Sequence, residues 1–348
     1  MTSESGRRRM AGALALLLGA ILALGSVPAL AVPAGYGNSE LRERKPKATP
    51  ELVAKGKVVY EKRCGFCHGE KGDGNGPVAD YLHPRPRDFT KGLYKFRTTK
   101  TGESPTDEDI FRTVSLGAPG TGMPAWGEGT FRLPEDELWQ VVFYIKSFFE
   151  DFADPEFNPY EELIKQGPPP AESSELIQLG RKIYIDEARG ACVKCHGPEG
   201  RGDGEEAGTQ KDDWDAPIMP ANLAAGWRYK NWGPSLEEVF RTLSTGLNGT
   251  PMPGYSDSLN ERERWALAYY VSSLQAEEAL GGKVVLTARS AEGKIPLRPD
   301  DPRWDKADRL EVPLSGQLIV RPRWPNPSVD RATVRALHDG RSIAFRIS

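Results

Sequence analysis

The sequence predicts a mainly α-helical protein, made of two tandem repeats and a C-terminal β segment. Three observations lead to this fold class. The pattern C-x-x-C-H occurs at 64–68 and again at 192–196, and the two copies use all four cysteines. The sequence around the copies repeats, most clearly where 109–113 aligns with 238–242 without a gap. From residue 279 onwards, helical periodicity gives way to apolar and polar residues that alternate, as they do in strands.

Composition narrows the class of protein further. The 348 residues are 27% charged and 38% hydrophobic, which is typical of a soluble globular protein. The formal net charge of −3 offers no basic field to phosphates, so we expect no nucleic-acid partner. Four cysteines are too few for a dense disulfide scaffold, and a single long apolar run excludes a multi-span membrane protein.

Residues 1–31 have the features of a secretory signal peptide. Arginines at 7–9 precede an apolar run over 10–24, and Ala29-Leu30-Ala31 supplies the small-x-small pattern that signal peptidase recognises. An uncleaved anchor helix is the alternative, but the run is shorter than the roughly 20 residues that span a membrane. We therefore expect export to the periplasm, and no membrane span after signal cleavage.

Each repeat is predicted to contain three helices. An amphipathic helix leads into the cysteine motif, a short helix runs from a capping residue to a glycine, and a third helix closes the repeat. In the first repeat these lie at 51–63, between Thr106 and Gly117, and at 135–149. In the second they lie at 174–187, between Ser235 and Gly246, and at 261–274.

Each C-x-x-C-H motif predicts covalent attachment of one haem c. Two thiols at this spacing reach the two vinyl groups of one porphyrin, and the next residue offers an imidazole nitrogen to the iron. A thiol–disulfide motif is an alternative, but no strand–helix context surrounds either pair. A zinc site would need further ligands, and no other cysteine exists. The residues concerned are Cys64, Cys67 and His68, then Cys192, Cys195 and His196.

With these motifs in place, both repeats resemble class I cytochrome c domains, over residues 50–152 and 173–278. The resemblance implies that His68 and His196 bind iron on one side. It implies that Met123 and Met252, 55 and 56 residues later, bind it on the other. Core packing is the alternative for each methionine.

The resemblance also carries expectations for the surroundings of the haem. It places the carbonyl that orients the first histidine near Gly76-Pro77, while the acceptor in the second repeat stays open. Arg85 and Arg87 either pair with haem propionates or belong to a solvated loop. His83 is expected at the surface or near the propionates, and Met219 is expected to line the pocket.

Residues 153–172 are rich in proline and predict a semi-rigid linker between the repeats. Residues 279–348 predict a β segment, the beginning of an incomplete β-sandwich-like domain. Its expected strands lie at 283–287, 317–320, 333–337 and 342–347, and Asp339-Gly340 predicts a hairpin turn between the last two.

The β segment resembles the start of a haem-binding domain of ethylbenzene dehydrogenase type, the γ subunit of exported molybdenum oxidoreductases. Residues 312–317 and 336–346 carry this resemblance. It implies that a full-length domain would hold haem b, that this sequence is truncated at its C-terminus, and that a molybdenum oxidoreductase complex is a partner.

These observations favour an exported dihaem c-type cytochrome, an electron carrier rather than an enzyme, which passes single electrons to redox partner proteins of a periplasmic complex. A dihaem peroxidase-like enzyme is one alternative, and it would need an open sixth position on one iron. A haem-based redox sensor is another, although no kinase, cyclase or DNA-binding pattern accompanies the repeats.

Overall fold

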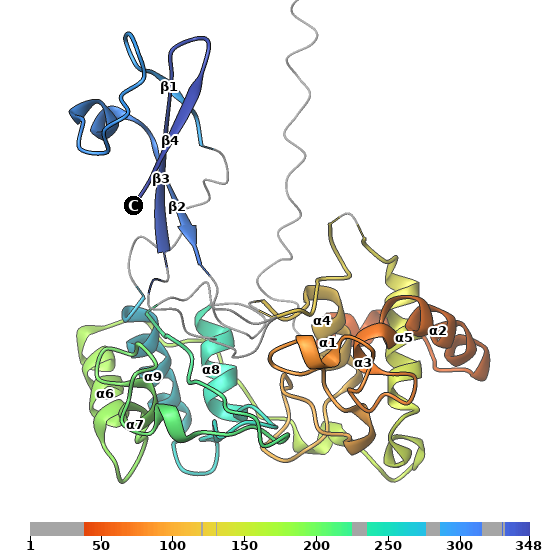
Figure 1. Cartoon of the computed structure of the whole chain (residues 1–348). Helices are drawn as coiled ribbons and strands as arrows, with labels where there is room; N and C mark the ends of the chain where they lie inside the picture. The colour runs from red at the N-terminus through yellow and green to blue at the C-terminus, as the bar shows by residue number, and fades with distance from the viewer. Residues whose placement is uncertain are drawn as a thin grey trace, which may run out of the picture. The chain divides into compact units, whose positions relative to one another are not determined.

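The computed structural model describes residues 38–119, 121–129, 131–224, 235–275, 286–314, 329 and 331–348. The chain divides into two compact units, Met1–Arg44 and Lys45–Ser348. In the first unit the described residues form helix α1 (Asn38–Arg44), and the signal peptide expected at 1–31 lies outside them. The second unit contains both repeats and the β segment (Figure 1). No helix of the described ranges is long and apolar enough to cross a membrane.

The first repeat has the helices that its sequence predicts. Thr49 caps α2 by accepting a hydrogen bond from the Leu52 amide, and Thr106 and Asp109 form a complete capping box on α4. Gly117, with a φ of 68°, ends α4 in a conformation that only glycine adopts readily. The elements are α2 (Pro50–Arg63), α3 (Gly65–His68), η1 (Ala79–Tyr81), η2 (Phe89–Lys91), α4 (Asp107–Leu116) and α5 (Glu135–Lys146).

The second repeat reproduces this arrangement. Ser235 caps α8, Gly246 ends it, and Asn260 with Glu263 forms a capping box on α9. The elements are α6 (Ser174–Ile185), α7 (Cys192–His196), η5 (Ala207–Thr209), α8 (Leu236–Thr245) and α9 (Glu261–Ser273). The predicted mainly α-helical class is therefore confirmed for both repeats.

Two of the predicted helix ends were too late. Helix α6 ends at Ile185 rather than at 187, because Asp186 adopts an extended conformation. Helix α5 ends at Lys146 rather than at 149, and the chain then turns so that the Phe148 ring packs 5.1 Å from the Tyr60 ring. Burial of this aromatic side chain against α2 replaces the last helical turn.

In each repeat the first and last helices cross at a glycine. Gly56 of α2 lies so close to α5 that a Cβ there would overlap the Gln140 carbonyl. Gly180 of α6 makes the same approach to the Ala266 carbonyl of α9. Tyr60 and Tyr184 are completely buried beside these crossings. The crossings fix the distance between the first and last helices of each repeat.

The predicted linker is held by hydrogen bonds to both repeats. Short 3-10 turns, η3 (Glu150–Ala153) and η4 (Pro159–Glu162), lie at its start. Ile164 then donates to the Thr98 carbonyl of the first repeat, and Gly167 donates to the Glu261 carboxylate of the second. The segment is therefore fixed by bonds to both repeats as well as by the stiffness of its prolines.

The β segment forms a four-stranded sheet. Strand β3 (Arg331–His338) pairs with β1 (Arg289–Ser290) in parallel, and with β2 (Arg309–Pro313) and β4 (Ile343–Ile347) in antiparallel fashion. The predicted hairpin at Asp339-Gly340 is confirmed, since the Asp339 amide donates to the Ser342 carbonyl. The sheet packs on η7 (Pro302–Lys306) through Trp304. The strand expected at 317–320, and 283–285 of the strand expected at 283–287, lie outside the described residues. Residues 286–287 are not in a strand, since β1 begins at Arg289.

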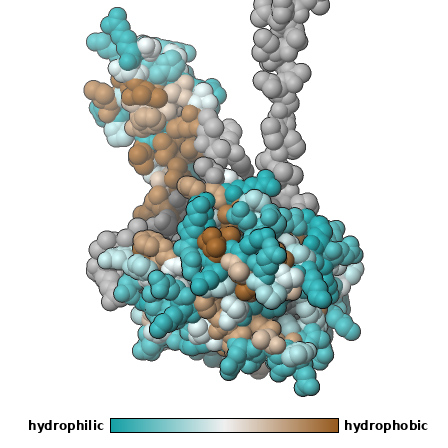
Figure 2. All heavy atoms as spheres, turned by 90° about the vertical axis from the view of Figure 1, so that its right-hand side faces the viewer, coloured by the Kyte–Doolittle hydropathy of each residue, from teal (hydrophilic) through white to brown (hydrophobic). Residues whose placement is uncertain are grey.

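Hydrophobic side chains gather over the strands of this segment (Figure 2). Ile343, Phe345 and Ile347 alternate along β4 and are 54%, 58% and 70% exposed. The helical repeat in the same view is covered mainly by hydrophilic residues. The sheet therefore differs from the repeat in this view in its surface as well as in its secondary structure.

Candidate functional site

Both cysteine motifs form a short helical turn that a buried tyrosine holds in place. Tyr60 Oη donates to the Gly69 carbonyl at 2.8 Å, and Tyr184 Oη donates to the Gly197 carbonyl at 2.6 Å. Cys64 and Cys192 are buried, while their partner cysteines are half-buried. The same turn, closed by the same bond, therefore occurs twice.

Each histidine of a motif is oriented by one backbone carbonyl. Nδ1 of His68 lies 3.1 Å from the Arg87 oxygen, and Nδ1 of His196 lies 2.9 Å from the Ala221 oxygen. A carbonyl can only accept, so Nδ1 carries the hydrogen and Nε2 is left as the electron-pair donor. This is the tautomer that an iron ligand needs.

The expectation that Gly76-Pro77 supplies the first acceptor was wrong. Gly76 instead packs on the cysteine turn, where its amide donates to the Cys67 carbonyl at 3.2 Å. Gly204 makes the equivalent bond to the Cys195 carbonyl. In both repeats, the next segment of chain crosses the turn and brings its own carbonyl to the imidazole.

These bonds also fix the register of the repeat after each motif. Gly74 donates to the His68 carbonyl, and Gly202 donates to the His196 carbonyl. The Gly-Asp-Gly tripeptides at 72–74 and 202–204 look equivalent in the sequence, but they are shifted by two residues in space. Gly74 matches Gly202, and Gly76 matches Gly204.

Burial sets the protonation of the candidate ligands. Burial lowers the pKa of His68 to about 4, and it also lowers the pKa of His196, so both imidazoles are neutral at pH 7. Burial raises the pKa of Cys64 to about 12 and that of Cys192 to about 11. Reactive disulfide-exchange cysteines have lowered pKa values, so this environment argues against that alternative.

The zinc alternative also lacks support. Within the described ranges, no three histidine, cysteine, aspartate or glutamate side chains group in a way that could hold a metal ion. An arrangement of two cysteines and one histidine per turn is what haem attachment requires.

The two predicted methionines lie on loops with the same internal bonds. The Met123 amide donates to Thr121 Oγ1 at 3.1 Å, and its carbonyl accepts from Ala118 at 3.1 Å. The Met252 amide donates to Thr250 Oγ1 at 3.2 Å, and its carbonyl accepts from Leu247 at 3.1 Å. Because both loops follow the glycine that ends α4 or α8, each methionine is delivered from the same place in its repeat.

The first repeat contains buried donors that have no partner among the described residues. The Tyr94 hydroxyl and Nη1 of Arg97 are two of them. The Tyr94 ring stacks on Phe89, and Phe89 stacks on the imidazole of His68 at 4.5 Å between centroids. A haem, which brings two carboxylates and a wide apolar ring, fits these residues, because it would satisfy donors that are otherwise costly to bury.

The remaining predicted residues have other surroundings. Arg85 pairs with Asp80 and Asn75, as expected for a loop residue. Arg87 reaches into the second repeat, where Nη2 donates to the Asn248 carbonyl at 3.0 Å. The side chain is 14% exposed, so a solvated loop does not describe this position, while pairing with a haem propionate stays a prediction. His83 is 7% exposed, so the surface position expected for it was wrong.

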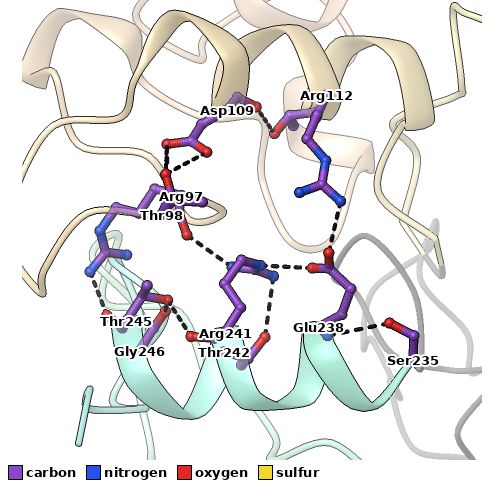
Figure 3. A network of polar contacts seen from close by, with 11 residues as sticks. Arg97, Thr98, Asp109, Arg112, Ser235, Glu238, Arg241, Thr242, Thr245 and Gly246 are labelled. Carbon is purple, nitrogen blue, oxygen red and sulfur yellow. Dashed lines mark hydrogen bonds and ion pairs between the residues drawn. The ribbon is translucent and has the colours of Figure 1, made fainter. Parts of the chain in front are cut away.

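Helices α4 and α8 bring charged residues of the two repeats together (Figure 3). Nη2 of Arg112 lies 2.7 Å from Glu238 Oε1, and Nε of Arg241 lies 2.7 Å from the other oxygen of this carboxylate. Arg241 Nη1 also donates to the Arg97 carbonyl at 3.1 Å, and Arg97 Nη2 donates to the Thr245 carbonyl at 2.5 Å. Except for the pair between Arg241 and Glu238 within α8, these bonds join the repeats across 126 to 148 residues of sequence.

Sequence reasoning missed this network although it used its residues. Arg112 and Arg241 occupy the same position of the aligned stretches 109–113 and 238–242, which served only to establish the repeat. An arginine occurs at the same position of both stretches, among residues that are mostly buried. This pattern could have indicated an ion pair between the repeats.

Glu238 gives the network a pH dependence. Burial alone would raise the pKa of its carboxyl, but Arg241 and Arg112 hold this pKa below its usual 4.5. The stabilisation is therefore complete above pH 4.5 and is lost as the pH falls through the pKa of the folded state. We expect Glu238→Gln to cost about 2 kcal/mol of unfolding free energy at pH 7, and less in acid.

Urea unfolding of the wild type and of this variant, from neutral to acidic pH, measures the difference. Glu237→Gln, one residue earlier on the same helix, is the matched control because the Glu237 side chain is exposed. If the wild type and Glu238→Gln lost the same amount of stability as the pH falls, the Glu238 carboxylate would not be the source of the pH dependence.

Comparison with known families matches the two repeats separately. Residues 51–145 match the family described as cytochrome c oxidase, cbb3-type, subunit III. Residues 177–275 match the family described as cytochrome c.

Individual relatives cover the same region. The cbb3-type cytochrome c oxidase subunit FixP of Bradyrhizobium diazoefficiens is 26% identical over 239 residues, which are 67% of this chain and 64% of that protein. Subunit CcoP of Azospirillum brasilense is 23% identical, over 64% of this chain and 62% of that protein. The chain thus spans less than two thirds of these relatives.

A solved structure is more similar. A chain of the Kuenenia stuttgartiensis reducing HAO-like protein complex Kustc0457/Kustc0458 is 43% identical, with a TM-score of 0.59. The match covers 98% of that chain and 66% of this one.

Proposed function

We propose that this chain, which belongs to the cytochrome c family and carries two of its domains in tandem, relays single electrons through two covalently bound haems. One observation carries the proposal. In both repeats, a half-buried neutral imidazole is turned by a backbone carbonyl so that its Nε2 is available, and a methionine loop with matching bonds follows. Each haem, when bound, supplies an iron that alternates between the ferrous and ferric states.

The chain's own residues hold and tune that group. Cys64 and Cys67 in the first domain would form its thioethers, with His68 and Met123 as iron ligands. In the second domain, Cys192 and Cys195 would form the thioethers, and His196 and Met252 would bind the iron. Ligation by histidine and methionine raises the reduction potential and leaves no open position for a substrate. The chain is accordingly an electron carrier and not an enzyme.

The setting that we propose is a periplasmic redox complex. The expected signal peptide supports export, and the names of the relatives describe subunits of an oxidase and of a multi-protein complex. The C-terminal sheet, with its exposed apolar strand β4, is proposed to bind the partner enzyme. A molybdenum oxidoreductase as that partner, and a haem b in a longer form of this segment, stay predictions of the sequence resemblance.

Carbon monoxide separates an electron carrier from the peroxidase-like alternative. We expect the reduced protein to show no carbon monoxide adduct, because methionine fills the sixth position on both irons. Peroxide should be turned over no faster than by free haem. An adduct on one haem, together with peroxide turnover, would contradict the carrier role and favour the enzyme.

A further inference from the structure

Arg97 stands out among the charged residues that the proposed electron relay does not use. Its side chain is completely buried, and it lies where the two domains meet. Nε donates to the Lys100 carbonyl at 3.1 Å, and Nη2 donates to the Thr245 carbonyl of the second domain at 2.5 Å. Nη1 is buried and has no partner among the described residues.

The neighbours of Arg97 place this free donor beside the first haem site. Phe96, the preceding residue, packs in one cluster with Met123, the proposed sixth ligand. Leu247 of the second domain packs in the same cluster, two residues after the Thr245 carbonyl that Arg97 binds. Residues next to both partners of the bond between Arg97 and Thr245 therefore pack in the same cluster as Met123.

The network between the two domains has more positive than negative charges, so an anion would be bound favourably there. Arg97, Arg112 and Arg241 bring three guanidinium groups into the network, whereas Asp109 and Glu238 bring two carboxylates (Figure 3). Glu103 and Arg87 also act on the charge of Arg97, and because they add one charge of each sign, the excess of one positive charge is unchanged. Burial and the nearby Arg241 lower the pKa of Arg97 to about 10, so the guanidinium is still charged at pH 7. A buried charge with an unused donor is costly unless a partner neutralises it.

We propose that Nη1 of Arg97 binds a propionate carboxylate of the haem attached to the first domain. This assignment rests on the proposed function, since it requires a haem at Cys64 and Cys67. One guanidinium then joins that carboxylate to the Thr245 carbonyl of the second domain. Arg97 both neutralises a charge beside the first iron and ties the first haem to the neighbouring domain.

Neutralisation of the carboxylate has a measurable consequence. In the wild type, the paired carboxylate stays ionised and Arg97 stays charged between about pH 5 and about pH 8, so the potential of the first haem should hardly change. Without Arg97 the carboxylate is unpaired, and its negative charge favours the ferric state. Its pKa also rises into this range, so the potential falls as the pH is raised.

The test is a potentiometric titration of the full chain with both haems attached, at several pH values, for Arg97→Gln and Arg97→Lys. We expect Arg97→Gln to lower the potential of one haem only, and to make that potential pH-dependent. Lysine keeps the charge but cannot reach both partners, so Arg97→Lys should give a smaller shift of the same sign. If Arg97→Gln yields no mature protein, Arg97→Lys decides the matter.

Arg112→Gln is the control for a loosened interface, because it breaks the ion pair with Glu238 and leaves Arg97 in place. Equal shifts in Arg112→Gln and in Arg97→Gln would overturn the proposal. So would potentials of both Arg97 variants that match the wild type at every pH. Haem counts on the same wild-type samples test the proposed function separately, because fewer than two haems per chain would refute it.

Discussion

Replacement of Met123 by histidine is expected to lower the reduction potential of one haem by on the order of 0.2 V and to leave the other unchanged. A thioether is a weak donor that favours ferrous iron, whereas a second imidazole favours ferric iron. Met123 would bind the iron together with His68. Potentiometric titration of the exported protein resolves the two haems, and the ferric spectrum should lose half of its methionine-to-iron band.

Two further variants make this result specific. Met252→His should shift the other haem by a similar amount, since its loop repeats the bonds of the first. Met219 is half-buried in the second domain but is assigned no ligand role, so Met219→Leu should move neither potential. Two unchanged potentials in Met123→His would show that this methionine packs in the core instead.

Substitution of Gly56 by alanine is expected to destabilise the first domain by about 3 kcal/mol or more. The added methyl group would overlap the Gln140 carbonyl, and backbone on both sides of the contact leaves nothing flexible to move aside. Helices α2 and α5 would have to separate, which would disturb the turn that carries Cys64. Denaturant unfolding, followed by far-ultraviolet circular dichroism and by haem absorbance, measures this loss.

Gly180→Ala should have the same effect on the second domain, since its methyl group would overlap the Ala266 carbonyl. Gly208→Ala is the matched control, because a Cβ at that position has no atom within 4 Å. A stability of Gly56→Ala equal to that of Gly208→Ala would mean that the helices do not cross as closely as described here.

Much of this site could be predicted from the sequence, because its signals are local. The cysteine motifs, the capping residues Thr106 and Asn260, and the two methionine loops each depend on residues within a short stretch of chain. Each of these features also occurs at the equivalent position of both repeats, which supports its assignment a second time. The hairpin at Asp339-Gly340 was predictable for the same reason, since one turn determines it.

The contacts that could not be predicted are those between distant segments. The acceptor for His68 is the Arg87 carbonyl, 19 residues later, and any residue type can supply a carbonyl. Arg87 and Arg97 find their partners in the second domain, so their roles depend on how the two domains pack. The sequence predicted either a solvated loop or a haem propionate for Arg87, and contact with the neighbouring domain was not among the alternatives.

The number and type of haems per chain test the central claim most directly. The pyridine haemochrome spectrum of the exported protein, normalised to chain concentration, gives both. Two haems of c type per chain are expected, with both lost from a variant in which Cys64, Cys67, Cys192 and Cys195 are all replaced by serine. One haem per chain, or none, would contradict the account of two equivalent sites.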